Sequence, residues 1–116
     1  MNFYDNLKIK MHNYVKCVYG VSKNFPEDEK FGVTSQLRRA SLSVILNFIE
    51  GYARRRGEKC KIFKNFLDIS YGSLKESKYL IYFSYTENYL EQKDYEELIA
   101  QADELGKMLW STVKNS

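Results

Sequence analysis

The sequence predicts an all-α protein, an antiparallel up-down four-helix bundle made by a single domain over residues 1–116. Three observations support this prediction. Four segments repeat apolar residues at the three- and four-residue spacing of one helix face. The chain contains one Pro and six Gly, which is little material for the many turns of a β fold. The links between the four segments are short and polar, as in bundles whose consecutive helices are neighbours.

The first helix is expected over residues 3–22. One face of it carries the apolar residues Leu7, Met11, Tyr14, Val15, Val18 and Val21. The segment "KNFPEDEK" follows, and its proline and acidic residues suit the first turn of a new helix. Gly32 interrupts this start, and the main second helix is expected over residues 35–56 with Thr34 or Ser35 as its N-cap.

The third helix is expected from about Glu58 to Tyr85. Its core face reads Phe63, Phe66, Leu67, Ser70, Leu74, Ser77, Leu80, Ile81 and Ser84. The serines on this face allow a neighbouring backbone to approach closely, and their hydroxyls can bond to the preceding turn. "TENYLEQKD" is a polar connection, and the last helix shows the apolar stripe Tyr95, Leu98, Ile99, Ala102, Leu105, Leu109 and Val113.

The second helix is apolar nearly all the way round in "ASLSVILNFI", residues 40–49. Its core face is expected to hold Leu37, Ala40, Val44 and Phe48. The opposite face then holds Leu42, Ile45 and Ile49. Because a small monomer rarely exposes such a patch, the pattern favours a self-association interface. The alternative is that a neighbouring helix of the same chain covers these residues.

The charged residues are expected to separate along the bundle. In an up-down bundle, the start of the first helix, the link between the second and third helices and the end of the fourth share one end. That end collects ten basic residues, namely Lys8, Lys10, Arg54, Arg55, Arg56, Lys59, Lys61, Lys64, Lys107 and Lys114. Only Asp5, Glu50 and Glu58 oppose them. The other end is predominantly acidic. A chain with a net charge of only +3 is therefore predicted to have one strongly basic end and one acidic end.

The candidate nucleic-acid-binding residues surround the second link: Arg54, Arg55, Arg56, Lys59, Lys61 and Lys64. The helix dipole favours cations where a helix ends, which accounts for the arginines. The three lysines occupy the start of the third helix instead, where acidic residues are favoured, and residues that break a local rule are candidates for function. Such a surface attracts RNA or DNA through its phosphates, without sequence readout. A solvated face, or a surface for an acidic protein partner, is the alternative.

Aromatic residues are abundant, with ten Tyr, seven Phe and one Trp. Tyr79, Tyr82, Tyr85 and Tyr89 are expected near the acidic end, where negative charge opposes base stacking on a nucleic acid. Tyr52 and Phe63 lie near the basic end and are the stacking candidates. Packing in the core or at an interface is the better explanation for all six.

The sequence contains no pattern that predicts catalysis, a cofactor or a metal. His12 is the only histidine, and Cys17 and Cys60 stand apart, so no zinc-ligand spacing exists. Phosphate-binding glycine motifs and the Glu-x-x-His pairs of di-iron bundles are both missing. The N-terminal segment lacks the apolar core of a signal peptide, and no stretch is long enough to span a membrane. We therefore expect a cytoplasmic, non-enzymatic protein with reduced thiols and no membrane partner.

The segment "FPEDEKFGVTSQLRRASLSVILNFIEGYARR" resembles the bacterial four-helix-bundle proteins encoded in intervening sequences of large-subunit ribosomal RNA genes. That family's pattern is approximately F-P-x-x-E-[RK]-[FY]-G-L-T-S-Q-[IL]-R-R-A, followed by S-x-x-x-N-I-A-E-G. The matching positions run from Phe25 to Ala40, and continue with Ser43, Asn47, Glu50 and Gly51. "FLDISYGSLKES" and "DYEELIAQADELGKML" resemble the family's third and fourth helices, so the resemblance covers nearly the whole chain.

Two departures from this pattern point to a related branch. Lys10 stands where the family often has Trp, and Ile45 stands where it often has Pro. The second departure makes the chain similar to the accessory variability determinant proteins of diversity-generating retroelements. That resemblance implies a homopentameric barrel with a basic surface that binds a reverse transcriptase and template RNA or DNA. The rest of the chain is closer to the first branch, so both branches stay open.

These inferences together predict a non-catalytic oligomer, a homopentamer by resemblance, that acts as a nucleic-acid-binding accessory protein. The subunit interface is expected to contain Arg38, Arg39, Leu42, Ile45 and Ile49, although the two arginines suit a ligand equally well. The runner-up is a structural oligomer whose partner is a protein and whose basic face is incidental. An enzyme with its site between subunits is a third, weaker possibility.

Overall fold

The computed structural model describes residues 2–57 and 60–116. It contains four long helices, α1 (Phe3–Ser22), α2 (Val33–Ala53), α3 (Lys61–Thr86) and α4 (Gln92–Lys114), and a short 3-10 helix, η1 (Glu27–Glu29). The all-α, four-helix class predicted from the sequence is confirmed, and these described ranges contain no strand. The molecule is a rod with extents of 46 × 25 × 20 Å.

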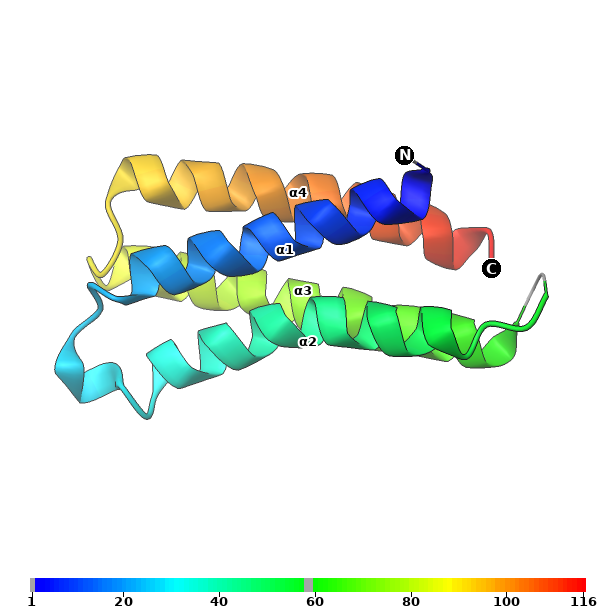
Figure 1. Ribbon diagram of the computed structural model, residues 1–116. Coiled ribbons are helices and arrows are strands. Elements are labelled where there is room, and N and C mark those ends of the chain that lie inside the picture. Colours follow the sequence, from blue (N-terminus) through cyan, green and yellow to red (C-terminus); the bar gives the residue numbers. More distant parts are fainter. Residues whose placement is uncertain (1, 58–59) are drawn as a thin grey trace.

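The two ends of the rod are built from different parts of the chain (Figure 1). Both termini and the link between α2 and α3 lie at one end, while η1 and the turn between α3 and α4 lie at the other. Helix α1 packs against α2 and α4, and α3 packs against the same two helices, with the most extensive contact between α2 and α3. Residues from three separate segments therefore meet at the end that carries the termini.

The core lies along the axis of the rod and contains most of the residues that the apolar periodicity predicts, but Val15 and Phe66 are only partly buried and lie outside the core cluster. The expected core face of α2 is buried in full, and α3 and α4 bury their predicted leucines. Fully buried large side chains come from all four long helices: Tyr14, Leu7 and Met11 from α1, Phe48 and Leu37 from α2, Leu67 and Ile81 from α3, and Leu98, Leu105 and Leu109 from α4. Burial of a side chain of this size contributes about 1.5–3 kcal/mol before the entropy of ordering is subtracted.

Small residues bring the backbones of α2 and α3 close together. The Ser70 hydroxyl donates a 2.6 Å hydrogen bond across the interface to the Val44 carbonyl. Ser43 and Ser73 share a hydrogen bond of 2.6 Å on the outer side of the same contact. Ser77 and Ser84, by contrast, bond to carbonyls of their own helix, as the sequence predicts. The serines thus let α2 and α3 approach closely while each of their hydroxyls has a hydrogen-bond partner. This matters because burying a hydroxyl without a partner is unfavourable.

The start of α2 differs from the sequence prediction. Thr34 and Ser35 do not cap the helix, because it begins at Val33 with Gly32 in the N-cap position. The cap comes from outside the helix, since the Glu29 carboxylate accepts a 3.2 Å hydrogen bond from the Val33 amide. The hydroxyl of Tyr89 donates a 2.9 Å hydrogen bond to the same carboxylate and holds it in place. A carboxylate at this position also suits the positive end of the helix dipole.

The link between α2 and α3 is longer than predicted. Helix α2 ends at Ala53 rather than at residue 56, and Arg54 is its C-cap. Gly57 has a φ of 66°, in the left-handed region that glycine adopts most easily, which ends any continuous helical path. Helix α3 then begins at Lys61, with Cys60 as its N-cap. The predicted start at Glu58, and Lys59 beside it, lie outside the described residues.

Candidate nucleic-acid interface

Arg54, Arg55 and Arg56 are consecutive at the end of α2, but their side chains have three different environments. Arg54 is paired within its own helix: its Nε and Nη2 donate hydrogen bonds of 3.0 and 2.7 Å to one oxygen of Glu50. Its guanidinium also lies 5.5 Å from the ring centre of Phe66. Both groups of this ion pair are about half exposed, so the pair adds little stability, but it compensates the Arg54 charge.

Arg55 points inward, among aromatic rings. Its guanidinium carbon lies 5.2 Å from the ring centre of Tyr4, 5.6 Å from that of Phe63 and 5.9 Å from that of Tyr52. The side chain is half-buried, and no carboxylate in the described part of the chain pairs with it. A ring face attracts a cation, and this attraction is strengthened where water is partly excluded. Arg55 is therefore a partly desolvated cation held in position by three aromatic side chains.

Arg56, Lys61 and Lys64 are exposed cations around the α2–α3 link. Arg56 donates hydrogen bonds of 3.1 and 3.5 Å to the carbonyls of Arg55 and Ala53, and no carboxylate of residues 2–57 or 60–116 pairs with it. The two lysines lie in the first turn of α3, as predicted. They face the positive end of a helix dipole, which gives them an unfavourable local interaction.

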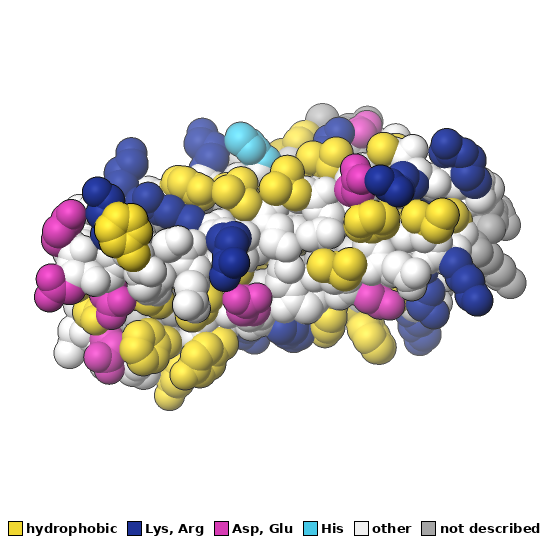
Figure 2. Space-filling model, turned by 90° about the horizontal axis from the view of Figure 1, so that it is seen from below, with side chains coloured by type: hydrophobic (Ala, Val, Ile, Leu, Met, Phe, Trp, Pro, Cys, Tyr) yellow, Lys and Arg dark blue, Asp and Glu magenta, His cyan; other side chains and the backbone are white. Residues whose placement is uncertain are grey.

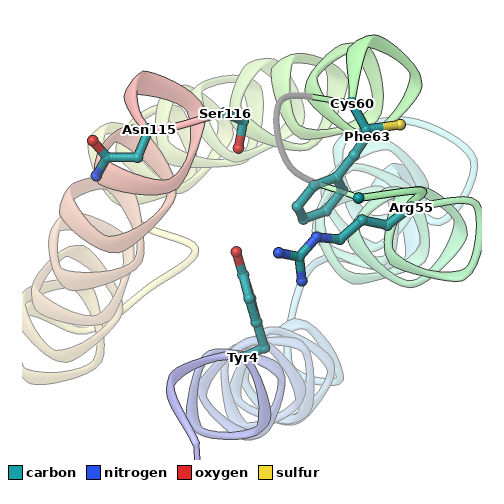
Figure 3. A pocket seen from close by; sticks show the side chains of 7 residues that line it. Tyr4, Arg55, Cys60, Phe63, Asn115 and Ser116 are labelled. Atoms are coloured by element: carbon teal, nitrogen blue, oxygen red, sulfur yellow. The ribbon is translucent and has the colours of Figure 1, made fainter.

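A cavity of about 320 Å³ opens at this end, between the start of α1, the α2–α3 link and the end of α4 (Figure 3). Among the residues that line it are Tyr4, Arg55, Cys60, Phe63, Asn115 and Ser116. Figure 3 shows the guanidinium of Arg55 and the hydroxyl of Tyr4 pointing into this space, one from the α2–α3 link and the other from α1. The cavity thus combines a cation, polar groups and aromatic walls, which is the mixture that orients a ligand in a protein site.

Cys60, next to this cavity, has an unusual thiol. Its pKa is lowered mainly by the backbone N–H of Phe63, which stabilises the thiolate, with smaller contributions from the N–H groups of Arg56 and Ile62 and from the Arg56 charge. Thiols at helix N-termini beside arginine commonly have a lowered pKa, because the thiolate is stabilised there. Sequence reasoning treated Cys60 only as a reduced cysteine and missed this setting.

The charges along the rod follow the predicted separation, with one correction. In Figure 2, Lys and Arg side chains gather at the right-hand end and Asp and Glu at the left-hand end, with some Lys and Arg along the upper left edge. Lys10, counted with the basic end, lies 3.1 Å from Glu104 of α4, so its charge is compensated. These two residues are far apart in the sequence, and only the packing of α1 against α4 brings them together.

The predicted interface residues are divided between the inside and the outside of the molecule. Arg38 is half-buried: its Nε donates a 2.8 Å hydrogen bond to Ser22, and its guanidinium lies 4.8 Å from the ring centre of Tyr19, so it ties α2 to α1. Ile45 packs against the core of its own chain and Leu42 is half-buried. Arg39 and Ile49 are exposed.

Further exposed apolar side chains extend the α2 face onto α3. Leu46 is 57 % exposed and Ile69 is 51 % exposed, and the helical register places both on the outer side of the α2–α3 contact. Ile62 follows on α3, one heptad before Ile69. The sequence analysis missed these three residues. The apolar periodicity of a helix identifies its buried face and gives no reason to select single apolar residues on the other faces.

No described helix combines the length and the apolar character that crossing a membrane requires. Within the same residues, no group of three His, Cys, Asp or Glu side chains is arranged to hold a metal ion.

Comparisons with known proteins identify the family. The model of the 23S rRNA-intervening sequence protein family matches residues 6–111. A crystal structure of a protein of unknown function from the S23 ribosomal protein family of Bacteroides thetaiotaomicron superposes with a TM-score of 0.85 and 21 % sequence identity, over 97 % of this chain and 99 % of that chain. At this identity, the structural likeness shows a shared fold. No curated protein matches the chain. The chain therefore belongs to the 23S rRNA-intervening sequence protein family.

Proposed function

We propose that this protein is a non-catalytic accessory protein of the cytoplasm that binds RNA or DNA through the end carrying the α2–α3 link. The supporting observation is the group of exposed cations Arg56, Lys61 and Lys64, which no carboxylate of the described residues neutralises. Two of them are placed against their helix dipole, a cost that phosphate binding offsets. Contacts of this kind give affinity for the phosphate backbone without reading the sequence.

The structure shows which basic residues can be substituted to test nucleic-acid binding without also affecting stability. Replacing Arg54 or Arg55 also removes the Glu50 pair or the contacts with three rings, so such variants confound binding with stability. The sharper variant is Arg56→Ala, Lys61→Ala, Lys64→Ala, because none of these side chains makes a side-chain hydrogen bond or ion pair with another described side chain. A matched control, Lys23→Ala, Lys30→Ala, Lys93→Ala, removes the same charge from exposed lysines at the other end.

The measurement is fluorescence anisotropy with a single-stranded RNA and a DNA duplex over a series of salt concentrations. We expect the affinity of the first variant to fall and its log–log salt slope to decrease by about 2 for the single strand, since each phosphate contact contributes about 0.7. The control is expected to retain most of the affinity. Equal losses in both variants, or binding that does not respond to salt, would contradict the proposal.

The proposed assembly is a homo-oligomer of antiparallel up-down bundles, with a homopentamer as the expected state. The apolar residues Leu46, Ile62 and Ile69 support it, together with Ile49 on the α1 side of α2, because each of these side chains is about half exposed to solvent. Light scattering on the wild type and on Leu46→Lys, Ile69→Lys tests this assembly. The variant is expected to have a lower molar mass in solution than the wild type. A wild type with the molar mass of a monomer would contradict the proposed assembly.

A structural oligomer with a protein partner is the second candidate, and the same apolar residues favour it. A reverse transcriptase of a retroelement is the protein partner that the sequence resemblance implies. Co-purification of this protein with such an enzyme, lost in the Leu46→Lys, Ile69→Lys variant but kept in the basic-end variant, would favour this candidate over direct nucleic-acid binding.

A further inference from the structure

The basic end contains a second feature that exposed cations do not explain, namely the cavity around Arg55. Arg56, Lys61 and Lys64 extend into solvent, whereas Arg55 is turned inward and half-buried. The three rings around it fix the position of its guanidinium while leaving its N–H groups without a hydrogen-bond acceptor among the described residues. A planar guanidinium presents a rigid fork of donors that matches two oxygens of a phosphate.

A second polar group enters the same space. The Tyr4 hydroxyl comes from the start of α1, whereas Asn115 lines the opposite wall, after the end of α4, with its amide directed away from Arg55 (Figure 3). The Ser116 hydroxyl is nearby but is already bonded to the Thr112 carbonyl at 2.6 Å. The cavity therefore offers the N–H groups of Arg55 and the O–H of Tyr4, from two separate segments, beside one half-buried positive charge.

We propose that this cavity binds the terminal phosphomonoester of a nucleic-acid strand, with the adjoining nucleotide against the rings of Tyr4 and Tyr52. This inference rests on the proposed nucleic-acid function and names the part of the strand that enters the cavity. A terminal phosphomonoester carries a charge close to −2 at neutral pH and three acceptor oxygens. An internal phosphodiester carries a single charge and two non-bridging oxygens.

Two properties of the cavity favour a strand end over an internal segment. Partial exclusion of water strengthens the interaction of Arg55 with a dianion more than with a monoanion. Three segments of the chain also wall the space, which suits a terminal group better than a backbone that must pass through. The volume of about 320 Å³ is at the lower end of the ~300–1,000 Å³ of ligand pockets, as expected for a phosphate with part of one nucleotide.

The test compares one single-stranded oligonucleotide in three forms: with a 5′ phosphate, with a 3′ phosphate, and with hydroxyls at both ends. Anisotropy titrations of the wild type are expected to show about ten-fold tighter binding of at least one phosphorylated form, the gain expected of charged hydrogen bonds. Arg55→Lys keeps the charge but loses the fork, and Tyr4→Phe loses only the hydroxyl. Both are expected to shrink this preference while changing the affinity for the hydroxyl-ended strand less than about two-fold.

Arg39→Lys is the matched control, because it makes the same chemical change at an exposed arginine outside the cavity and outside the group Arg56, Lys61 and Lys64, and it should leave the preference intact.

Four results would overturn the inference. Equal binding of all three strand forms removes the end preference while leaving the proposed nucleic-acid function standing, whereas no binding of any form removes both. A free nucleoside monophosphate that competes as well as the phosphorylated strand would show that the cavity takes small molecules rather than strand ends. An unchanged preference in both Arg55→Lys and Tyr4→Phe would place the end-binding site elsewhere.

Discussion

The Tyr14 hydroxyl donates a 2.7 Å hydrogen bond to the Ser77 hydroxyl in the buried centre of the bundle, joining α1 to α3. The direction of this bond follows from the second bond of Ser77, whose only hydroxyl proton is directed at the Leu74 carbonyl, 2.8 Å away. Tyr14 is therefore the donor. The pair links two helices whose contact is otherwise limited to the core, so it is a direct probe of the packing.

The two single substitutions at this pair should have unequal effects on stability. Tyr14→Phe leaves Ser77 with one bond and is expected to lower the free energy of unfolding by about 1 kcal/mol. Ser77→Ala leaves a buried tyrosine hydroxyl without a partner and is expected to cost about 1–3 kcal/mol. The double variant should lose less than the sum of the two, because the orphaned hydroxyl is gone. Urea denaturation of the three variants measures the cycle, and strict additivity would contradict the bond.

The same tyrosine should make stability depend on alkaline pH. Burial raises the pKa of Tyr14 far above its usual value, because the charged phenolate would lose its hydration in the core. The unfolded chain loses this proton above about pH 10, while the folded chain keeps it. The contribution of Tyr14 is thus fully present below pH 10 and is lost as the pH rises above that value. Unfolding free energies from pH 8 to pH 11 should fall less steeply for Tyr14→Phe than for the wild type.

Gly51 is expected to tolerate no side chain. A Cβ at this position would lie 2.6 Å from the Cβ of Phe66, because α2 and α3 approach closely there. Gly51→Ala should lower the free energy of unfolding by about 1–3 kcal/mol through overpacking. Gly72→Ala is the control, since nothing lies within 4 Å of its added Cβ and alanine is the better helix former by about 1 kcal/mol. Opposite signs of the two changes in thermal unfolding are the expected result.

The Cys60 thiol should react faster than an ordinary thiol at neutral pH. Its pKa is lowered mainly by the nearby backbone N–H of Phe63, so a larger fraction is the reactive thiolate. The rate of iodoacetamide alkylation, followed by mass spectrometry in a Cys17→Ser variant, should have a pH midpoint below the usual value of about 8.5. Arg56→Ala should move that midpoint upward by a small amount, because its charge is the weakest of the contributions. A midpoint at or above the usual value would refute the prediction.

The sequence by itself determined the helices and their buried faces. Leu37, Val44 and Phe48 were assigned to the core correctly, because the spacing of apolar residues on one helix is a local property. The ends of the helices were harder to predict from the sequence. Helix α2 takes its N-terminal cap from Glu29, which precedes the helix and is held in place by Tyr89 from another part of the chain. Sequence preferences for N-cap residues consider only the residues next to the first helical turn, and they therefore predicted Thr34 or Ser35.

Only the tertiary structure decided what each basic residue does. Arg54, Arg55 and Arg56 cannot be told apart in the sequence. In the structure, Arg54 pairs with Glu50, Arg55 lies among aromatic rings, and Arg56 is exposed without a carboxylate partner among the described residues. The difference arises because Tyr4 and Phe63 reach Arg55 from other helices, at a register that packing sets. The pairing of Lys10 with Glu104 has the same origin. Periodicity along one chain fixes which face of a helix is buried, but contacts between side chains depend on how far each helix slides and rotates against its neighbours.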